Sequence, residues 1–135
     1  MATWDDVRRL ALALPETAEK PSHGNVSWRV RDKLFVWERP LREKEMEELG
    51  EDAPDGPILG ARVEDLSAKQ AMIADGPELY FTTSHFDGYP SVLVRLERIG
   101  EEDLAELVTE AWLARASQRL TQRYLEGRGL GPPAR

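Results

Sequence analysis

The chain has 135 residues, of which 41% are hydrophobic and 32% are charged, and its formal net charge is −7. This length and balance predict one soluble globular domain. Cysteine is absent from the sequence, which excludes disulfides, thiolate metal sites and cysteine nucleophiles.

The first predicted element is a helix that begins near Thr3 and ends at Pro15. Thr3 and Asp6 have the spacing of a capping box, and an apolar stripe from Val7 to Leu14 predicts one buried face. Acidic residues stand here where a signal peptide needs a basic region, and no later run reaches the roughly 18 to 20 apolar residues of a membrane span. We therefore expect a cytoplasmic protein that does not bind a membrane.

A hairpin is predicted next, after a loop at residues 16–24. Residues 26–30 alternate between apolar and polar side chains, which is typical of a half-buried strand, and residues 34–39 form the second strand. A tight turn at Asp32–Lys33 joins the two strands. The basic residues of this hairpin and its exit are the candidate nucleic-acid-binding residues: Arg29, Arg31, Lys33, Arg39 and Arg42.

The middle of the chain is predicted to hold an acidic segment, a short strand and a helix. Residues 41–57 contain seven acids, two prolines and two glycines, which predicts a helical turn followed by an exposed loop. Residues 58–74 are predicted to form a strand and then a helix capped by Asp65, with Leu66 and Ile73 facing inward.

Two further strands are predicted at residues 79–83 and 91–97, joined by a turn-rich link that contains both glycine and proline. Helices occupy the remainder, with a break near Ala116–Ser117 and an end near Gly127. This order of elements, with its hairpin-length links, predicts an α+β domain at residues 1–127. It is a mainly antiparallel sheet of about five strands, covered by helices on one face. Residues 128–135 are expected to form a disordered tail.

Charge is spread unevenly along the sequence. The net charge is +2 over residues 1–42, −13 over residues 43–110 and +4 over residues 111–135. A negative field over the whole molecule repels nucleic acid at long range, so DNA contact requires a local basic face.

The two histidines raise the question of catalysis or metal binding. His23 and His85 each lie beside a serine, but catalytic triads are assembled by the fold, and the sequence has no nucleophile-elbow motif. Histidine and aspartate are common metal ligands, so His85, Asp87 and His23 would suit a metal site if their loops converge. The alternative is structural: the link hydrogen-bonds its own strands, and Gly88 permits an unusual backbone conformation. We predict no catalytic residue, no cofactor and no metal.

Two motifs, TTSHFDGYPSVLVRL at residues 82–96 and EAWLARASQRL at residues 110–120, resemble the MmcQ/YjbR-like family of small bacterial proteins. The segment LALALPETAEKPSHGNVSWRVRDKLFVW also resembles the start of that family. The resemblance implies a CyaY-like fold of the frataxin kind and a DNA-binding role with a double-wing arrangement of hairpins. Frataxin-like proteins bind iron through acidic surfaces, which raises an iron interpretation of residues 43–55 or 101–103, although a fold does not establish a function.

We therefore predict a non-enzymatic, monomeric DNA-binding or regulatory protein. It contacts the phosphate backbone weakly, and with little base specificity, through the basic hairpin. An alternative is a small-molecule or protein-binding domain that uses the link between the last two strands. A third, less favoured, is an acidic metal-binding protein. The candidate pocket residues of the binding domain are His85, Asp87, Tyr89 and Trp112.

Overall fold

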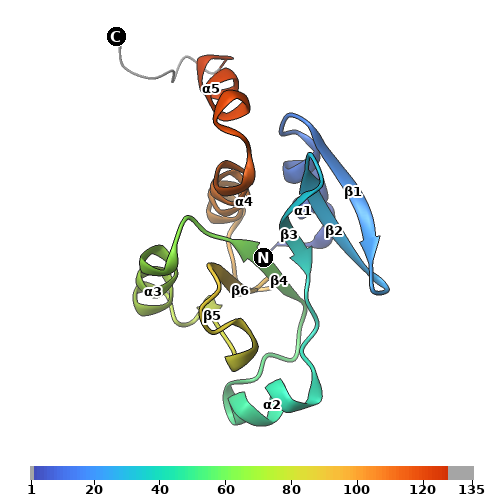
Figure 1. Ribbon diagram of the computed structural model, residues 1–135. Helices are drawn as coiled ribbons and strands as arrows, with labels where there is room; N and C mark the ends of the chain where they lie inside the picture. The colour runs from blue at the N-terminus through green and yellow to red at the C-terminus, as the bar shows by residue number, and fades with distance from the viewer. Residues whose placement is uncertain (1, 128–135) are drawn as a thin grey trace.

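The computed structural model describes residues 2–127, which form six strands, five α-helices and two short 3-10 helices (Figure 1). The strands are β1 (Thr17–Ser22), β2 (Asn25–Val30), β3 (Lys33–Glu38), β4 (Ile58–Arg62), β5 (Tyr80–Phe81) and β6 (Ser91–Arg95). The α-helices are α1 (Trp4–Leu12), α2 (Glu43–Leu49), α3 (Leu66–Asp75), α4 (Glu101–Arg115) and α5 (Gln118–Gly127). The 3-10 helices are η1 (Gly50–Asp52) and η2 (Ser84–Phe86).

All six strands belong to one sheet, in the order β1-β2-β3-β4-β6-β5. Every neighbouring pair is antiparallel. The link through α3 is a crossover, because β4 and β5 run in the same direction on either side of β6. The predicted α+β class with a mainly antiparallel sheet is confirmed. Among the described residues, no helix has the length and apolar character needed to cross a membrane.

The sixth strand is β1, which replaces the loop predicted at residues 16–24. Its four central residues are exposed and its two end residues are half-buried, so it lacks the apolar alternation that identifies a half-buried strand. A two-residue turn at His23 and Gly24, both with positive φ, joins it to β2, and such turns match the twist of a hairpin. The strand lies at the sheet edge, where a proline such as Pro21 is tolerated.

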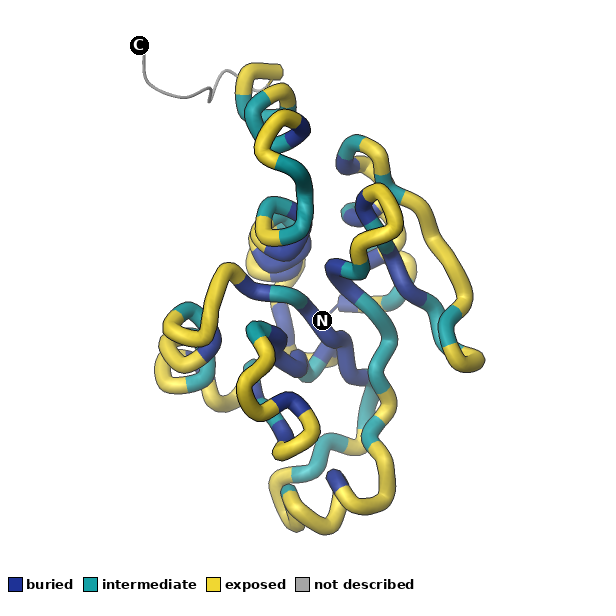
Figure 2. Tube along the Cα trace, in the orientation of Figure 1, coloured by how far each residue is buried: buried dark blue, intermediate teal, exposed yellow. Residues whose placement is uncertain are grey.

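The two faces of the sheet carry separate apolar clusters, because side chains alternate along each strand. On β6, Val92 and Val94 belong to the main core, which contains residues of α1 and α4, whereas Leu93 belongs to a smaller cluster with Ile58. Leu49 of α2 packs against this second cluster. Figure 2 shows burial concentrated on the central strands and α4, and an exposed β1.

Several predicted helix boundaries are confirmed by their caps. Asp6 N–H donates to Thr3 Oγ1 at 3.3 Å at the start of α1, and Asp65 accepts from Ala68 N–H at the start of α3. Ser117 Oγ accepts from Leu120 N–H at 3.1 Å after the predicted break. Leu66 is expected to face inward but is 44% exposed at the first position of α3. The tail predicted at residues 128–135 lies outside the described residues.

Candidate nucleic-acid interface

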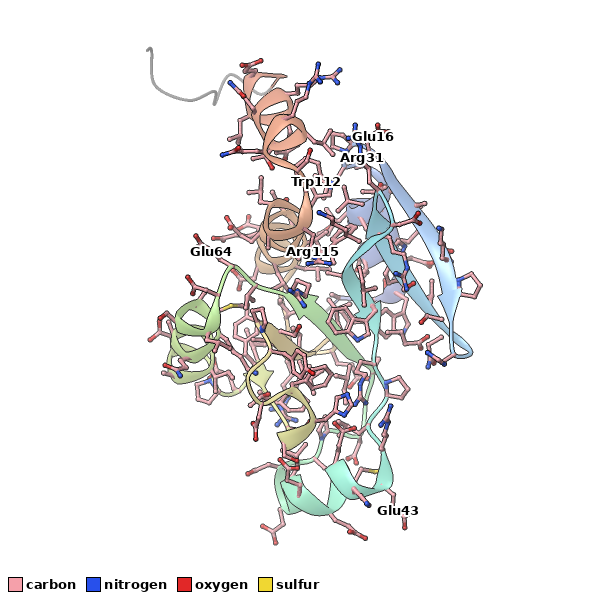
Figure 3. The ribbon with its side chains drawn as sticks, viewed as in Figure 1. Glu16, Arg31, Glu43, Glu64, Trp112 and Arg115 are labelled. Atoms are coloured by element: carbon pink, nitrogen blue, oxygen red, sulfur yellow. The ribbon has the colours of Figure 1, made fainter. Side chains whose placement is uncertain are left out.

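The predicted basic hairpin is formed by β2 and β3, and most of its cations already contact protein groups. Arg31 Nη2 lies 3.1 Å from Glu16 Oε1 (Figure 3), and Arg29 Nη1 donates to the Asp32 carbonyl at 3.4 Å. Lys33 is exposed and its side chain forms neither an ion pair nor a hydrogen bond within residues 2–127. Exposed pairs of this kind are weak, so these arginines remain able to exchange partners.

The tip of the hairpin has strained backbone at a basic residue. Arg31 and Asp32 adopt φ values of 47° and 69°, as the two central residues of a type I′ turn must. Aspartate tolerates this region, but a long side chain such as arginine does so at a cost of roughly 1 to 2 kcal/mol. The turn therefore keeps a charged residue where asparagine or glycine would be more stable.

The remaining two predicted residues lie at the exit of the hairpin and have different roles. Arg39 is mostly buried and pairs with Glu45, whose Oε1 lies 2.9 Å from Arg39 Nη1. Its guanidinium also lies 5.1 Å from the centre of the Phe86 ring. Arg42 is exposed, and its backbone N–H donates to Glu45. Arg39 is thus occupied inside the protein, whereas the Arg42 side chain faces solvent.

Glu45 holds α2 against η2 through a buried polar network, the α2 network, which consists of Arg39, Glu45 and Thr83. Thr83 Oγ1 donates to Glu45 Oε2 at 2.6 Å, and Arg39 Nη2 donates to the same oxygen at 3.0 Å. Burial raises the pKa of Glu45, but the hydrogen bonds from Thr83, the Arg42 N–H and Arg39 outweigh it and leave that pKa below its ordinary value. The carboxylate is therefore charged and fully engaged.

Two arginines that the hairpin prediction did not include lie next to each other. Arg62 is the last residue of β4 and Arg115 is the last residue of α4. Both are half-buried, and neither side chain forms an ion pair or hydrogen bond within the described part of the chain. Their Nε atoms are buried and have no hydrogen-bond partner among residues 2–127. Burial and then the positive charge of Arg115 lower the pKa of Arg62.

Such a pair is unfavourable unless an anion neutralises it, because two like charges repel most strongly where water is partly excluded. The carbonyl end of α4 offsets part of the cost at Arg115. Sequence reasoning missed the pair since its members end a strand and a helix 53 positions apart. Arg119 and Arg123 do not continue it along one helix, because the chain breaks at Ser117.

The link with His85, Asp87 and Tyr89 is exposed and is held from beneath by Lys69. Lys69 is buried, and its Nζ donates to the carbonyls of Phe86 and Tyr89 at 2.7 and 2.9 Å. Burial lowers the pKa of Lys69, and sequence analysis gave no sign of this role. Gly88 has a φ of 80°, which agrees with the structural interpretation of the link.

The four candidate pocket residues are not gathered in one place. Trp112 is fully buried, donates from Nε1 to the Pro15 carbonyl at 3.0 Å and packs against Tyr124. It lies near α5, far from η2, which carries His85 (Figures 1 and 3). Within residues 2–127, no group of three or more histidine, aspartate or glutamate side chains is arranged to hold a metal ion. His23 lies in the β1–β2 turn, away from the link.

Comparisons with known proteins agree with this architecture. The YjbR family model matches residues 12–114. The uncharacterized proteins Rv2570 of Mycobacterium tuberculosis (strain H37Rv) and Mb2600 of Mycobacterium bovis are each 54% identical over 132 residues, covering 96% of this chain and 100% of the relative. The crystal structure of Deinococcus radiodurans protein DR2400, with the family domain DUF419, matches with a TM-score of 0.66 at 16% identity. That match covers 99% of this chain and 94% of the other, and it confirms the fold.

Proposed function

The chain belongs to the YjbR family, and we propose that it is a non-enzymatic protein that binds the phosphate backbone of DNA with little base specificity. The proposed contact surface is the basic end, which comprises the β2–β3 hairpin and the ends of β4 and α4. Its residues are Arg29, Arg31, Lys33, Arg62 and Arg115.

The observation that carries this proposal is the Arg62–Arg115 pair, which lacks a counter-ion within residues 2–127. A phosphate oxygen placed between the guanidinium groups would relieve their repulsion and accept charge-assisted hydrogen bonds from both. Figure 3 places Arg31 and Arg115 in the same half of the molecule, and α4 packs against β3. A phosphate bound by Arg62 and Arg115 would therefore hold the DNA strand near the tip of the β2–β3 hairpin.

The strained tip of the hairpin supports the same surface. Arg31 occupies a backbone conformation that costs free energy and carries a guanidinium into solvent, and such costs are often retained where a residue contacts a ligand. By contrast, the serine beside His85 is engaged elsewhere: Ser84 Oγ donates to Glu48 Oε1 at 2.7 Å. This arrangement gives no support to a serine nucleophile.

The test is a fluorescence-anisotropy titration of labelled duplex DNA at about 50 and 200 mM salt, in which phosphate contacts make affinity fall steeply with salt. We expect Arg62→Gln/Arg115→Gln to weaken binding by on the order of tenfold or more and to lower the salt dependence. Lys44→Gln is the control, because Lys44 is an exposed cation on α2. Absence of binding at 50 mM, or an equal effect of the control, would overturn the proposal.

A further inference from the structure

A groove with the opposite charge lies between α3 and α4, beside the ends of β4 and β5. Its volume is about 460 Å³, which is in the range of small-molecule sites. The elements that form it are α3, α4, β5 and the link from β4 to α3, where Figure 3 shows Glu64. We call this feature the acidic groove.

The floor of the acidic groove is apolar. It is formed by Val63, Ala68, Met72, Leu79 and Leu107, with the Tyr80 ring beside them. Met72, Leu79 and Tyr80 are only partly buried, so apolar surface remains open to solvent inside the groove. A ligand with an apolar part would remove this surface from water, which is favourable by roughly 25 cal/mol per Å².

Five carboxylates surround this floor: Glu64, Asp75, Asp103, Glu106 and Glu110. None of their side chains forms an ion pair or a hydrogen bond with another of the described residues. Burial raises the pKa of the Tyr80 hydroxyl, and the negative charges of Asp103, Glu106 and Glu78 raise it further, so the field of this rim extends to the floor. Among the described residues that line the groove, Arg62 is the one basic residue, and burial and the charge of Arg115 lower its pKa.

We propose that the acidic groove binds a small organic cation, namely a protonated amine or guanidinium joined to an apolar group. The carboxylates would receive the charged head while the apolar part covers Met72 and Leu79. An anion would be repelled, and a neutral apolar molecule would leave the rim without a counter-charge. The proposal does not rest on DNA binding, because it concerns the carboxylates and the apolar floor of the groove. The two surfaces adjoin at Arg62, which lines the groove and also belongs to the basic end.

The experiment is an isothermal titration with 4-phenylbutylammonium and with its neutral counterpart 4-phenylbutanol. We expect the cation to bind about tenfold more tightly than the alcohol, because each exposed ionic contact contributes about 0.2 to 1 kcal/mol and several carboxylates act on the same charge. Asp103→Asn/Glu106→Gln should reduce the affinity for the cation at least fivefold. The control is Glu47→Gln/Glu51→Gln, which removes the same charge from exposed positions on α2 and η1 and should leave the affinity unchanged.

The location of binding is checked by the carbon-13 methyl signals of methionine. Met72 lines the groove, whereas Met46 is exposed on α2 and serves as an internal reference. A shift of the Met72 signal alone supports the proposal. Equal binding of cation and alcohol, an equal effect of the control variant, or a shift confined to Met46 would each overturn it. Binding of a lysine-rich peptide with none of 4-phenylbutylammonium would also overturn it, in favour of a macromolecular partner.

Discussion

The α2 network and the basic end use arginine in opposite ways. In the α2 network, Arg39 is buried against a carboxylate that also accepts from Thr83. At the basic end, Arg62 and Arg115 are half-buried beside each other with no acceptor within residues 2–127. A buried cation that is paired within the protein makes its partner necessary to the fold, because removing that partner leaves a buried charge uncompensated. A cation whose neighbour is another cation is available to a ligand. The degree of burial alone does not distinguish a structural arginine from a ligand-binding one, but the sign of the neighbouring charge does.

The largest effect is expected where the α2 network is broken. Glu45→Ala leaves Arg39 buried without its counter-ion and Thr83 without its acceptor, and we expect it to lower the free energy of unfolding by about 3 kcal/mol. Urea denaturation followed by tryptophan fluorescence measures the change. Glu47→Ala, at an exposed position of the same helix, should change the stability by less than about 0.5 kcal/mol.

The pH dependence of the stability of the wild type and of Glu45→Ala tests whether the loss of the Glu45 charge is the cause. The pKa of Glu45 in the folded state is below its ordinary value of 4.5, so its contribution is fully present above that pH. The contribution is lost as pH falls through the lowered pKa, because the unfolded chain binds the proton first. The stability difference between the wild type and Glu45→Ala should therefore shrink below about pH 4.5. A difference that stays constant down to pH 3 would point to lost packing and not to lost charge.

Elements that can be identified from neighbouring residues are predicted by the sequence. Features that depend on tertiary contacts are not. The cap at Thr3 depends on neighbouring residues and is present in the structure. The strand β2 also forms where its alternation predicts it, but Ser27 is buried as well as Trp28, and a bulge between Trp28 and Arg29 interrupts the alternation. The polar edge strand β1 carries no apolar period and was predicted as a loop. Of the candidate site, Arg31 and Lys33 could be proposed because they lie on one hairpin. The Arg62–Arg115 pair could not, because only the fold brings the two chain positions together.

A smaller loss of stability is expected at Thr83, which tests the network without removing its charge. Thr83→Val keeps the shape but removes the donor to Glu45 Oε2. Since hydrogen bonds to charged groups contribute about 1.5 to 3 kcal/mol, we expect a loss near the lower value. Ser84→Ala is the matched control, because Ser84 donates to the exposed Glu48. Its effect on urea denaturation should stay within about 0.5 kcal/mol, and equal losses would show that burial of the network is unimportant.

The smallest effect, and the one of opposite sign, is expected at the basic end. Arg62→Met keeps the apolar stem and removes one of two repelling charges, so the free protein should become more stable by about 0.5 to 1 kcal/mol. For a domain of this size, that is a rise of roughly 2 to 4 °C in the melting temperature. Thermal denaturation with and without duplex DNA measures both the stability of the free protein and its stabilisation by DNA, because a bound ligand raises the melting temperature of the protein that binds it. We expect DNA to stabilise the wild type more than the variant. If Arg62→Met lowers stability without DNA, the two guanidinium groups do not repel each other, and the basis for assigning phosphate to this pair is removed.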